Sequence, residues 1–216
     1  MIKAVIFDMD GTMLDTEHIK EEGLKYAGKC LNVNIDNETL TQIRGTNNKR
    51  LKEILCNKFE GLDVEKLLDI REKYVETYFE NHPIETKKGL LELLEFLKNH
   101  EYKMAVASSS NLEVIKKYLK KVEVLDYFDI IMGGDLVTKG KPDPEIYLKC
   151  LERLGLSEEE CIGVEDTANG VLSIHKAGMK PIMIPDLEEP SKEVEQVVYA
   201  KLESLLDVIL LLKEMN

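Results

Sequence analysis

The apolar residues of the chain follow two different spacings. After residue 86, short apolar runs alternate with longer segments in which apolar residues recur every three or four positions. Such runs predict buried strands, and such segments predict amphipathic helices. The expected strands, including one before this region, are 4–7, 104–107, 128–132, 161–164 and 181–184. The expected helices are 89–98, 112–121, 144–154, 168–177 and one or two within 192–213.

The segment between the first strand and residue 83 has the helical spacing alone. Its expected helices are 17–31, 37–44, 48–59 and 64–81, separated by turn and cap residues. Alternating strands and helices with short connections imply right-handed crossovers and a parallel sheet covered on both faces. We therefore predict an α/β fold: a Rossmann-like parallel sheet core formed by residues 1–15 and 86–216, with an inserted all-helical cap domain at 16–85.

Charge and composition narrow the class of protein. The chain has 216 residues and a formal net charge of −12, which argues against nucleic acid and anionic membrane as partners. Its apolar runs are too short for a secretory signal, which needs about 7–15 residues, or for a membrane span of about 20. No cysteine spacing indicates zinc or a disulfide framework: Cys30, Cys56, Cys150, Cys161. We expect a cytoplasmic monomer.

Two carboxylates follow the first strand. Asp8 and Asp10 lie two residues apart, and residues i and i+2 of an extended chain point the same way. In open α/β sheets the ligand crevice lies at the carboxyl ends of the strands. Two such close anions repel each other unless they bind a cation or share a proton. The alternative is an ordinary turn formed by Asp and Gly.

Further polar residues follow the other expected strands. Ser108 follows the second and Glu165-Asp166 the fourth, while Lys141 lies in a loop before a helix. Clustered oxygen ligands without His or Cys suit a hard ion such as Mg²⁺. The expected metal site consists of the Asp8 and Asp166 side chains, the main-chain carbonyl of Asp10, and Glu165 acting through a water molecule.

Together, these residue types can catalyse a phosphoryl transfer in which each has a separate role. Asp8 can attack phosphorus and form an aspartyl-phosphate. Asp10 can protonate the leaving oxygen and then activate the water that hydrolyses this intermediate. Lys141 and the Ser108 hydroxyl can neutralise and orient the phosphoryl oxygens. We therefore expect catalytic roles for Asp8, Asp10, Ser108 and Lys141.

Four motifs resemble those of the haloacid dehalogenase superfamily. They occur in the family's order: Asp8-x-Asp10-Gly11-Thr12, Ser108 after an apolar strand, Lys141-Pro142-Asp143-Pro144, and Gly163-Val164-Glu165-Asp166-Thr167-x-x-Gly170. The chain is most similar to the subgroup with a helical cap inserted after the first strand, which includes β-phosphoglucomutase and sugar-phosphate phosphatases. The resemblance implies the residue roles given above and a Mg²⁺-dependent hydrolase.

Two positions bear on the reaction type. Where the β-phosphoglucomutase pattern has a His, four residues after Thr16, this chain has Lys20, and where that pattern has a cap Arg, it has Asn48. An Asn cannot give the bidentate grip on a second phosphate that an Arg gives. We expect a phosphatase that acts on a small phosphorylated metabolite such as a sugar phosphate. The alternatives are a mutase and a non-catalytic phospho-accepting switch, although Asp10 and the inserted cap argue against the switch.

Several polar residues are candidates for contacts with the substrate. The joint between the second and third cap helices is polar and partly basic, so we expect it to face the active site. A solvated turn is the alternative at this joint, and helix capping is the alternative for Thr16 and for the serines and Asn after the second strand. The expected substrate-binding residues are Thr16, Gly45, Asn47, Asn48, Ser109 and Asn111.

Overall fold

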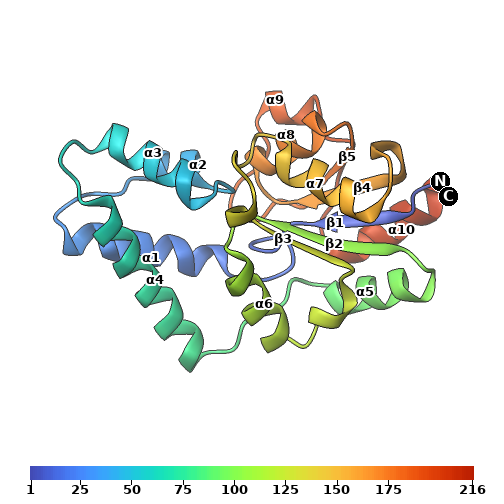
Figure 1. The fold of residues 1–216 in the computed structure, drawn as a ribbon, viewed down its shortest axis with the longest axis horizontal. Helices are drawn as coiled ribbons and strands as arrows, with labels where there is room; N and C mark the ends of the chain where they lie inside the picture. The colour runs from blue at the N-terminus through green and yellow to red at the C-terminus, as the bar shows by residue number, and fades with distance from the viewer.

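A six-stranded parallel sheet forms the centre of the molecule, in the order β3-β2-β1-β4-β5-β6 (Figure 1). The computed structural model describes residues 1–216. Phe7 aligns with Val106 and Val164 on the neighbouring strands, so the carboxyl ends of β1, β2 and β4 meet at one edge. The predicted α/β fold is confirmed. The strands are β1 Ala4–Phe7, β2 Lys103–Ser108, β3 Ile130–Gly133, β4 Cys161–Glu165, β5 Lys180–Met183 and β6 Ala200–Lys201.

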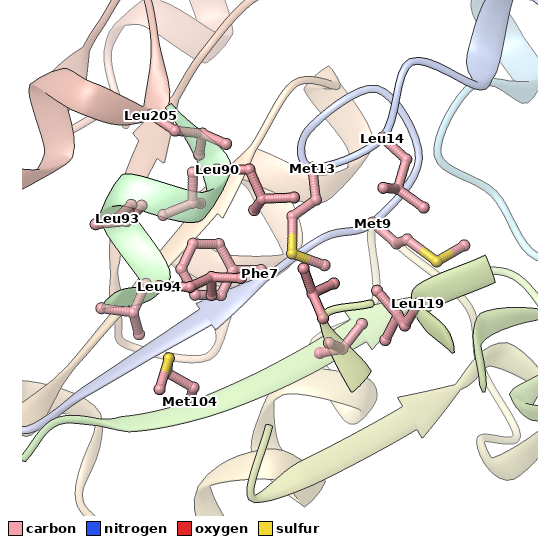
Figure 2. Close-up of a cluster of buried hydrophobic side chains, with 14 of the residues drawn as sticks. Phe7, Met9, Met13, Leu14, Leu90, Leu93, Leu94, Met104, Leu119 and Leu205 are labelled. Atoms are coloured by element: carbon pink, nitrogen blue, oxygen red, sulfur yellow. The ribbon is translucent and has the colours of Figure 1, made fainter. Parts of the chain in front are cut away.

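Helices cover both faces of the sheet. They are α5 Leu90–Asn99, α6 Leu112–Lys121, α7 Glu145–Leu154, α8 Ala168–Lys176, α9 Lys192–Glu195 and α10 Leu205–Met215. Alternate residues of β1 are buried on opposite faces. Val5 and Phe7 join a cluster with α5, α6 and α10, in which Figure 2 shows Phe7 next to Leu94. Ala4 and Ile6 pack with α7 and α8 on the other face. Strand β1 is therefore fully buried, as its continuous apolar run predicts.

Four helices lie consecutively between β1 and α5, on one side of the core in Figure 1. We call them the helical module: α1 Glu17–Cys30, α2 Asn37–Ile43, α3 Asn48–Lys58 and α4 Val64–Asn81. The module has its own hydrophobic cluster, which includes Leu24 of α1 and Leu67 of α4. Asp36 and Asp63 accept hydrogen bonds from the first turns of α2 and α4. None of the helices combines the length and the apolar character that a membrane span requires.

The two linkers between the module and the core run side by side. The Asp15 N–H donates to the Glu85 carbonyl at 2.9 Å, and the Lys87 N–H donates to the Met13 carbonyl at 2.8 Å. The Lys87 ammonium also pairs with Asp15 at 2.9 Å and with Asp186 of the core at 2.7 Å. The module therefore joins the core through two adjacent, mutually hydrogen-bonded segments.

The carboxyl-terminal part contains one element that was not predicted. The two helices expected there, α9 and α10, are present, and the edge strand β6 lies between them. Strand β6 has two residues, pairs only with β5, and has an exposed lysine, Lys201. Such a short edge strand has neither an apolar run nor alternation. Pairing with β5, rather than local sequence, therefore determines its conformation.

Candidate active site

A tight turn after β1 brings both predicted aspartates to the carboxyl edge of the sheet. Within it, the N–H groups of Met13 and Leu14 donate to the Met9 carbonyl, each at 2.9 Å. Gly11 has φ of +87°, and a Cβ there would lie 2.3 Å from a carboxylate oxygen of Asp166. Only glycine combines this backbone conformation with so close an approach. The turn thus allows Gly11 of the first motif to lie directly against Asp166 of the fourth motif.

Lys141 is buried among carboxylates. Its Nζ lies 2.6 Å from Asp8 Oδ1 and 2.6 Å from Glu165 Oε1, and the residue is 1% exposed. Although burial lowers the pKa of a lysine, the charges of Asp8 and Glu165 raise the pKa of Lys141 well above its ordinary value. The ammonium is therefore a fixed positive charge beside the predicted nucleophile.

Glu165 is held in place by the start of the following loop. Its Oε2 accepts hydrogen bonds from the N–H groups of Asp166 and Thr167, each at 2.9 Å, and from the Thr167 hydroxyl at 3.0 Å. Gly170 lies against it, and a Cβ there would be only 1.7 Å from Oε1. The glycine of the fourth motif thus provides the space that this carboxylate occupies.

Three buried carboxylates gather beside Lys141. Asp8, Glu165 and Asp166 each offer an oxygen within 4.8 Å of the others. Burial raises the pKa of Asp8 to about 8, although the Lys141 ammonium acts in the opposite direction. Burial and the charge of Glu165 raise the pKa of Asp166 well above its ordinary value. One cation does not compensate three carboxylates, and an all-oxygen donor set suits a divalent hard ion, so these residues fit Mg²⁺.

The Asp10 carboxylate lies apart from this group and faces the helical module. Its Oδ1 accepts from the Thr16 hydroxyl at 2.6 Å, and its Oδ2 lies 2.6 Å from the Lys20 ammonium. Ser110 donates to Oδ2 at 2.8 Å and Ser108 at 3.4 Å. Although burial raises it, the net effect of Lys20 and these hydrogen bonds is to lower the pKa of Asp10. The Thr16 hydroxyl, predicted to contact substrate, thus donates its hydrogen bond to Asp10 in this structure.

A cavity of about 210 Å³ opens between the module and the core above Asp8 and Asp10. Four of the residues predicted to bind substrate line it: Gly45, Asn48, Ser109 and Asn111. The Ser109 hydroxyl donates to the Gly45 carbonyl at 2.6 Å, which joins the core to the joint between α2 and α3. Part of the polar joint, including Gly45 and Asn48, therefore faces the active site.

Asn47 does not lie where a substrate contact was expected. Its side-chain oxygen accepts the Arg50 N–H at 3.0 Å and caps α3, and the residue is 4% exposed. Asn47 lies against Gly140 of the core and does not line the cavity above the aspartates. Capping satisfies a backbone donor that would otherwise be unpaired, which explains this orientation.

Several charged residues of the cavity wall were not predicted as substrate contacts, among them Lys20, Glu17 and Arg71. Lys20 contacts Asp10 and was considered only as a departure from the mutase pattern. Glu17, one α1 turn before it, lines the cavity with its side chain 14% exposed. Arg71 of α4 also lines it and has no carboxylate within 4.0 Å. The spacing of Thr16 and Lys20 was the available signal, because residues four apart share a helix face.

The family profile described as "Haloacid dehalogenase-like hydrolase" matches residues 5–184. The chain belongs to this family. It is an enzyme of the phosphatase type, and the predicted resemblance is confirmed. The four motifs of this hydrolase thus form one continuous site at the carboxyl edge of the sheet.

Individual relatives of this hydrolase agree with that assignment. A phosphorylated carbohydrates phosphatase of Thermotoga maritima is 31% identical, with 96% of this chain and 98% of that protein aligned. The β-phosphoglucomutase of Bacillus subtilis is 29% identical over 82% and 81% of the two chains. The crystal structure of a putative β-phosphoglucomutase from Thermotoga maritima superposes with a TM-score of 0.75, at 29% identity and full coverage of both chains.

We predict that Glu145, which anchors the Lys141 loop, makes stability depend on acid pH. Its carboxylate pairs with Lys149 at 2.8 Å and accepts the N–H groups of Thr138 and Lys139, which lowers its pKa from 4.5 to about 2. Because the folded pKa lies below the unfolded value, this stabilisation is present above pH 4.5 and is lost as pH falls towards 2. Glu145→Gln should lower the melting temperature at pH 7 by about 2 °C. A difference from wild type that stayed constant down to pH 2 would contradict this.

A second prediction concerns Tyr147, which packs behind the active-site lysine. The Lys141 ammonium lies 5.2 Å from the centre of its ring, while its buried hydroxyl has no hydrogen-bond partner. Burying an unpaired hydroxyl costs free energy, so Tyr147→Phe should raise the free energy of unfolding by about 1 kcal/mol. The aromatic face beside Lys141 is retained, and kcat should stay within twofold. Urea denaturation and steady-state kinetics test both parts, and a destabilised variant would reveal a role for the hydroxyl.

Proposed function

We propose that this enzyme is a Mg²⁺-dependent phosphatase that hydrolyses a small phosphorylated carbohydrate through an aspartyl-phosphate on Asp8. The observation that carries the proposal is the environment of Asp8. Its carboxylate is buried, pairs with Lys141 at 2.6 Å, lies beside Glu165 and Asp166, and forms part of the cavity wall. A nucleophile, fixed positive charge and a metal-binding group therefore converge where a phosphoryl group can enter.

The residues proposed to hold the ion are the Asp8 and Asp166 side chains and the main-chain carbonyl of Asp10, with Glu165 next to them. When bound there, Mg²⁺ neutralises charge on the phosphoryl oxygens and fixes their orientation. Thr12 supports this arrangement, because its hydroxyl donates to Asp166 at 2.8 Å. Lys141 adds positive charge at the same place, which stabilises the charge that develops during transfer.

The proposed chemistry has two steps. In the first, an Asp8 oxygen attacks phosphorus and the bond to the leaving oxygen breaks, while Asp10 gives that oxygen a proton, which it has to take up beforehand because its pKa is lowered in this structure. In the second, Asp10 takes a proton from water, whose oxygen attacks phosphorus and releases phosphate while Asp8 regains its electron pair. Thr16 and Lys20 hold the Asp10 carboxylate in position for both transfers. Ser108 contributes its hydroxyl beside Asp10.

The lining and size of the cavity support the proposal that the leaving group is small and carries several hydroxyls. Its wall presents the amides of Asn48 and Asn111, the hydroxyl of Ser109 and the carboxylate of Glu17, which donate to or accept from sugar hydroxyls. Its volume of about 210 Å³ suits a small metabolite rather than a polymer. The Thermotoga maritima relative, named a phosphorylated carbohydrates phosphatase, supports the same substrate class.

A mutase is the second candidate, and one observation favours it. Arg71 lines the cavity without a carboxylate partner, so it offers a guanidinium that can bind a second phosphate where Asn48 cannot. The Bacillus subtilis relative, named a β-phosphoglucomutase, points the same way. The two reactions differ in whether water or a sugar hydroxyl attacks the aspartyl-phosphate.

The test of the proposed function is phosphate release from a panel of sugar phosphates, with and without Mg²⁺. Asp10→Asn is expected to lower kcat about 10³-fold, because neither proton transfer can then occur at that position. The variant should retain the fold, which a thermal melt checks. The side-chain oxygen of Asn can still accept the Thr16 hydroxyl, whereas the charged pair with Lys20 and the hydrogen bonds that Ser110 and Ser108 donate to Oδ2 are lost.

Products distinguish the alternatives. β-Glucose 1-phosphate with a bisphosphate primer should yield free phosphate from a phosphatase and glucose 6-phosphate from a mutase. Stable phosphorylation of Asp8 without turnover would instead support a phospho-accepting switch. Activity that persists in Asp10→Asn and in the absence of Mg²⁺ would overturn the proposal.

A further inference from the structure

A second cavity lies on the seam between the helical module and the core. Its volume is about 360 Å³, and it shares no lining residue with the cavity above Asp8 and Asp10. One wall is the start of α3, and the other is the loop 138–143 together with the end of α8. None of its lining residues is hydrophobic. It is therefore a polar cavity.

The charges of this cavity oppose the charge of the protein as a whole. Apart from Lys141, which is committed to Asp8 and Glu165, the lining carries four cations and two carboxylates, while the chain as a whole carries −12. The cations are Lys49, Arg50, Lys139 and Lys176, and the carboxylates are Glu53 and Asp143. A local positive potential of this kind attracts anions.

The cations are weakly paired. Lys49 and Lys176 have no carboxylate within 4.0 Å, whereas Arg50 lies 3.3 Å from Glu53 and Lys139 lies 3.7 Å from Asp143. Both pairs are exposed to solvent, where ion pairs contribute little and are screened by salt. All four cations can therefore turn towards a ligand at small cost.

The two walls belong to different parts of the molecule. Lys49 and Arg50 lie in the first turn of α3, whereas Lys139 and Lys176 belong to the core. Like charges on facing walls repel, which opposes closure of the module on the core. The positive end of α3 adds to the potential on the module side. An anion placed between the walls would convert this repulsion into attraction on both sides.

We propose that this cavity is a regulatory site for a multiply charged oxyanion of the phosphate class, which holds the helical module against the core. The floor includes Gly140 and Lys141, and Gly140 packs against Asn47 of the module. A bound anion thereby acts on the loop that carries the active-site lysine and on the joint that lines the substrate cavity. Inorganic phosphate and pyrophosphate are the two candidate ligands of this class.

Thermal unfolding in sulfate tests binding without turnover. Sodium sulfate is titrated against sodium chloride at equal ionic strength, in the absence of Mg²⁺. At ten times its Kd, sulfate should raise the melting temperature of the wild type by about 3 °C. In Lys49→Gln/Lys176→Gln the shift should fall to less than half, and any remainder reports binding at the active site. The control Lys25→Gln/Lys120→Gln removes two exposed, unpaired lysines elsewhere and should respond as wild type does.

Kinetics supply the second readout. Sulfate competing at the active site raises KM alone, whereas sulfate at the second cavity should change kcat in wild type and in the control but not in Lys49→Gln/Lys176→Gln. Repeating the melts with phosphate and pyrophosphate ranks the two candidate ligands. Equal melting shifts in all three proteins, or a kcat response that survives in the double variant, would overturn the proposal.

Discussion

Replacing Asp8 with Asn is expected to lower kcat for phosphate release by at least about 10⁴-fold, because the amide cannot form the aspartyl-phosphate. The neighbouring charges should remain in place, since Lys141 keeps Glu165 at 2.6 Å. Single-turnover measurements with a sugar phosphate check this, with transfer of labelled phosphate to the protein followed in parallel. Wild type should become labelled transiently, and the variant should not.

A matched control separates chemistry from general effects of losing a carboxylate. Asp126→Asn changes an exposed residue remote in the sequence from the four motifs, and it should leave kcat within twofold. If Asp8→Asn kept a substantial part of the activity, another nucleophile would have to attack phosphorus. The role of Asp8 as nucleophile would then be wrong, although the family and the fold would be unaffected.

The second large effect is expected at Lys141. Lys141→Met fills similar space but leaves Asp8, Glu165 and Asp166 buried without their ammonium. Removing one partner of a buried ion pair typically costs about 3–5 kcal/mol, and we expect a loss of that size in the free energy of unfolding. Phosphate release should also fall below detection. Urea denaturation measures the stability, and it should be repeated with Mg²⁺.

The Mg²⁺ arm makes this prediction specific. A divalent cation among three uncompensated carboxylates should stabilise Lys141→Met more than it stabilises wild type. The control is Lys103→Met, which breaks the exposed pair with Asp129 at 2.9 Å and should change stability by less than about 1 kcal/mol. Equal Mg²⁺ effects on Lys141→Met and wild type would argue against a metal site at these carboxylates.

Much of the core was predictable because local patterns and the final contacts agree there. The apolar run 4–7 is buried on both faces, and the polar residues after β1, β2 and β4 meet because parallel strands end at one edge. Asp8, Lys141, Glu165 and Asp166 come together as their motif positions imply. The short edge strand β6 was not predicted, because its two residues carry no sequence pattern that indicates pairing with β5.

The cavity wall was predicted less well, since its composition depends on how the helical module meets the core. Lys20 and Arg71 lie on different helices, and although its spacing from Thr16 is a signal for Lys20, nothing in the α4 sequence indicates that Arg71 lines the same cavity. Asn47 and Asn48 are adjacent and chemically identical, yet one caps α3 and the other lines the cavity. Adjacent residues at the start of a helix point in different directions, and the sequence does not show which of the two will face the cavity.

The paired linkers at Asp15 and Glu85 allow substrate choice and chemistry to change independently. The helical module leaves and re-enters the core at neighbouring points joined by hydrogen bonds, so a replacement segment has to begin and end at that spacing. It also has to contact Asp10 and Ser109, as Lys20 and Gly45 do here, whereas the sheet and the carboxylates around Lys141 can stay unchanged. Exchange of this segment for a different one is thus a direct route to new specificities on an unaltered catalytic core.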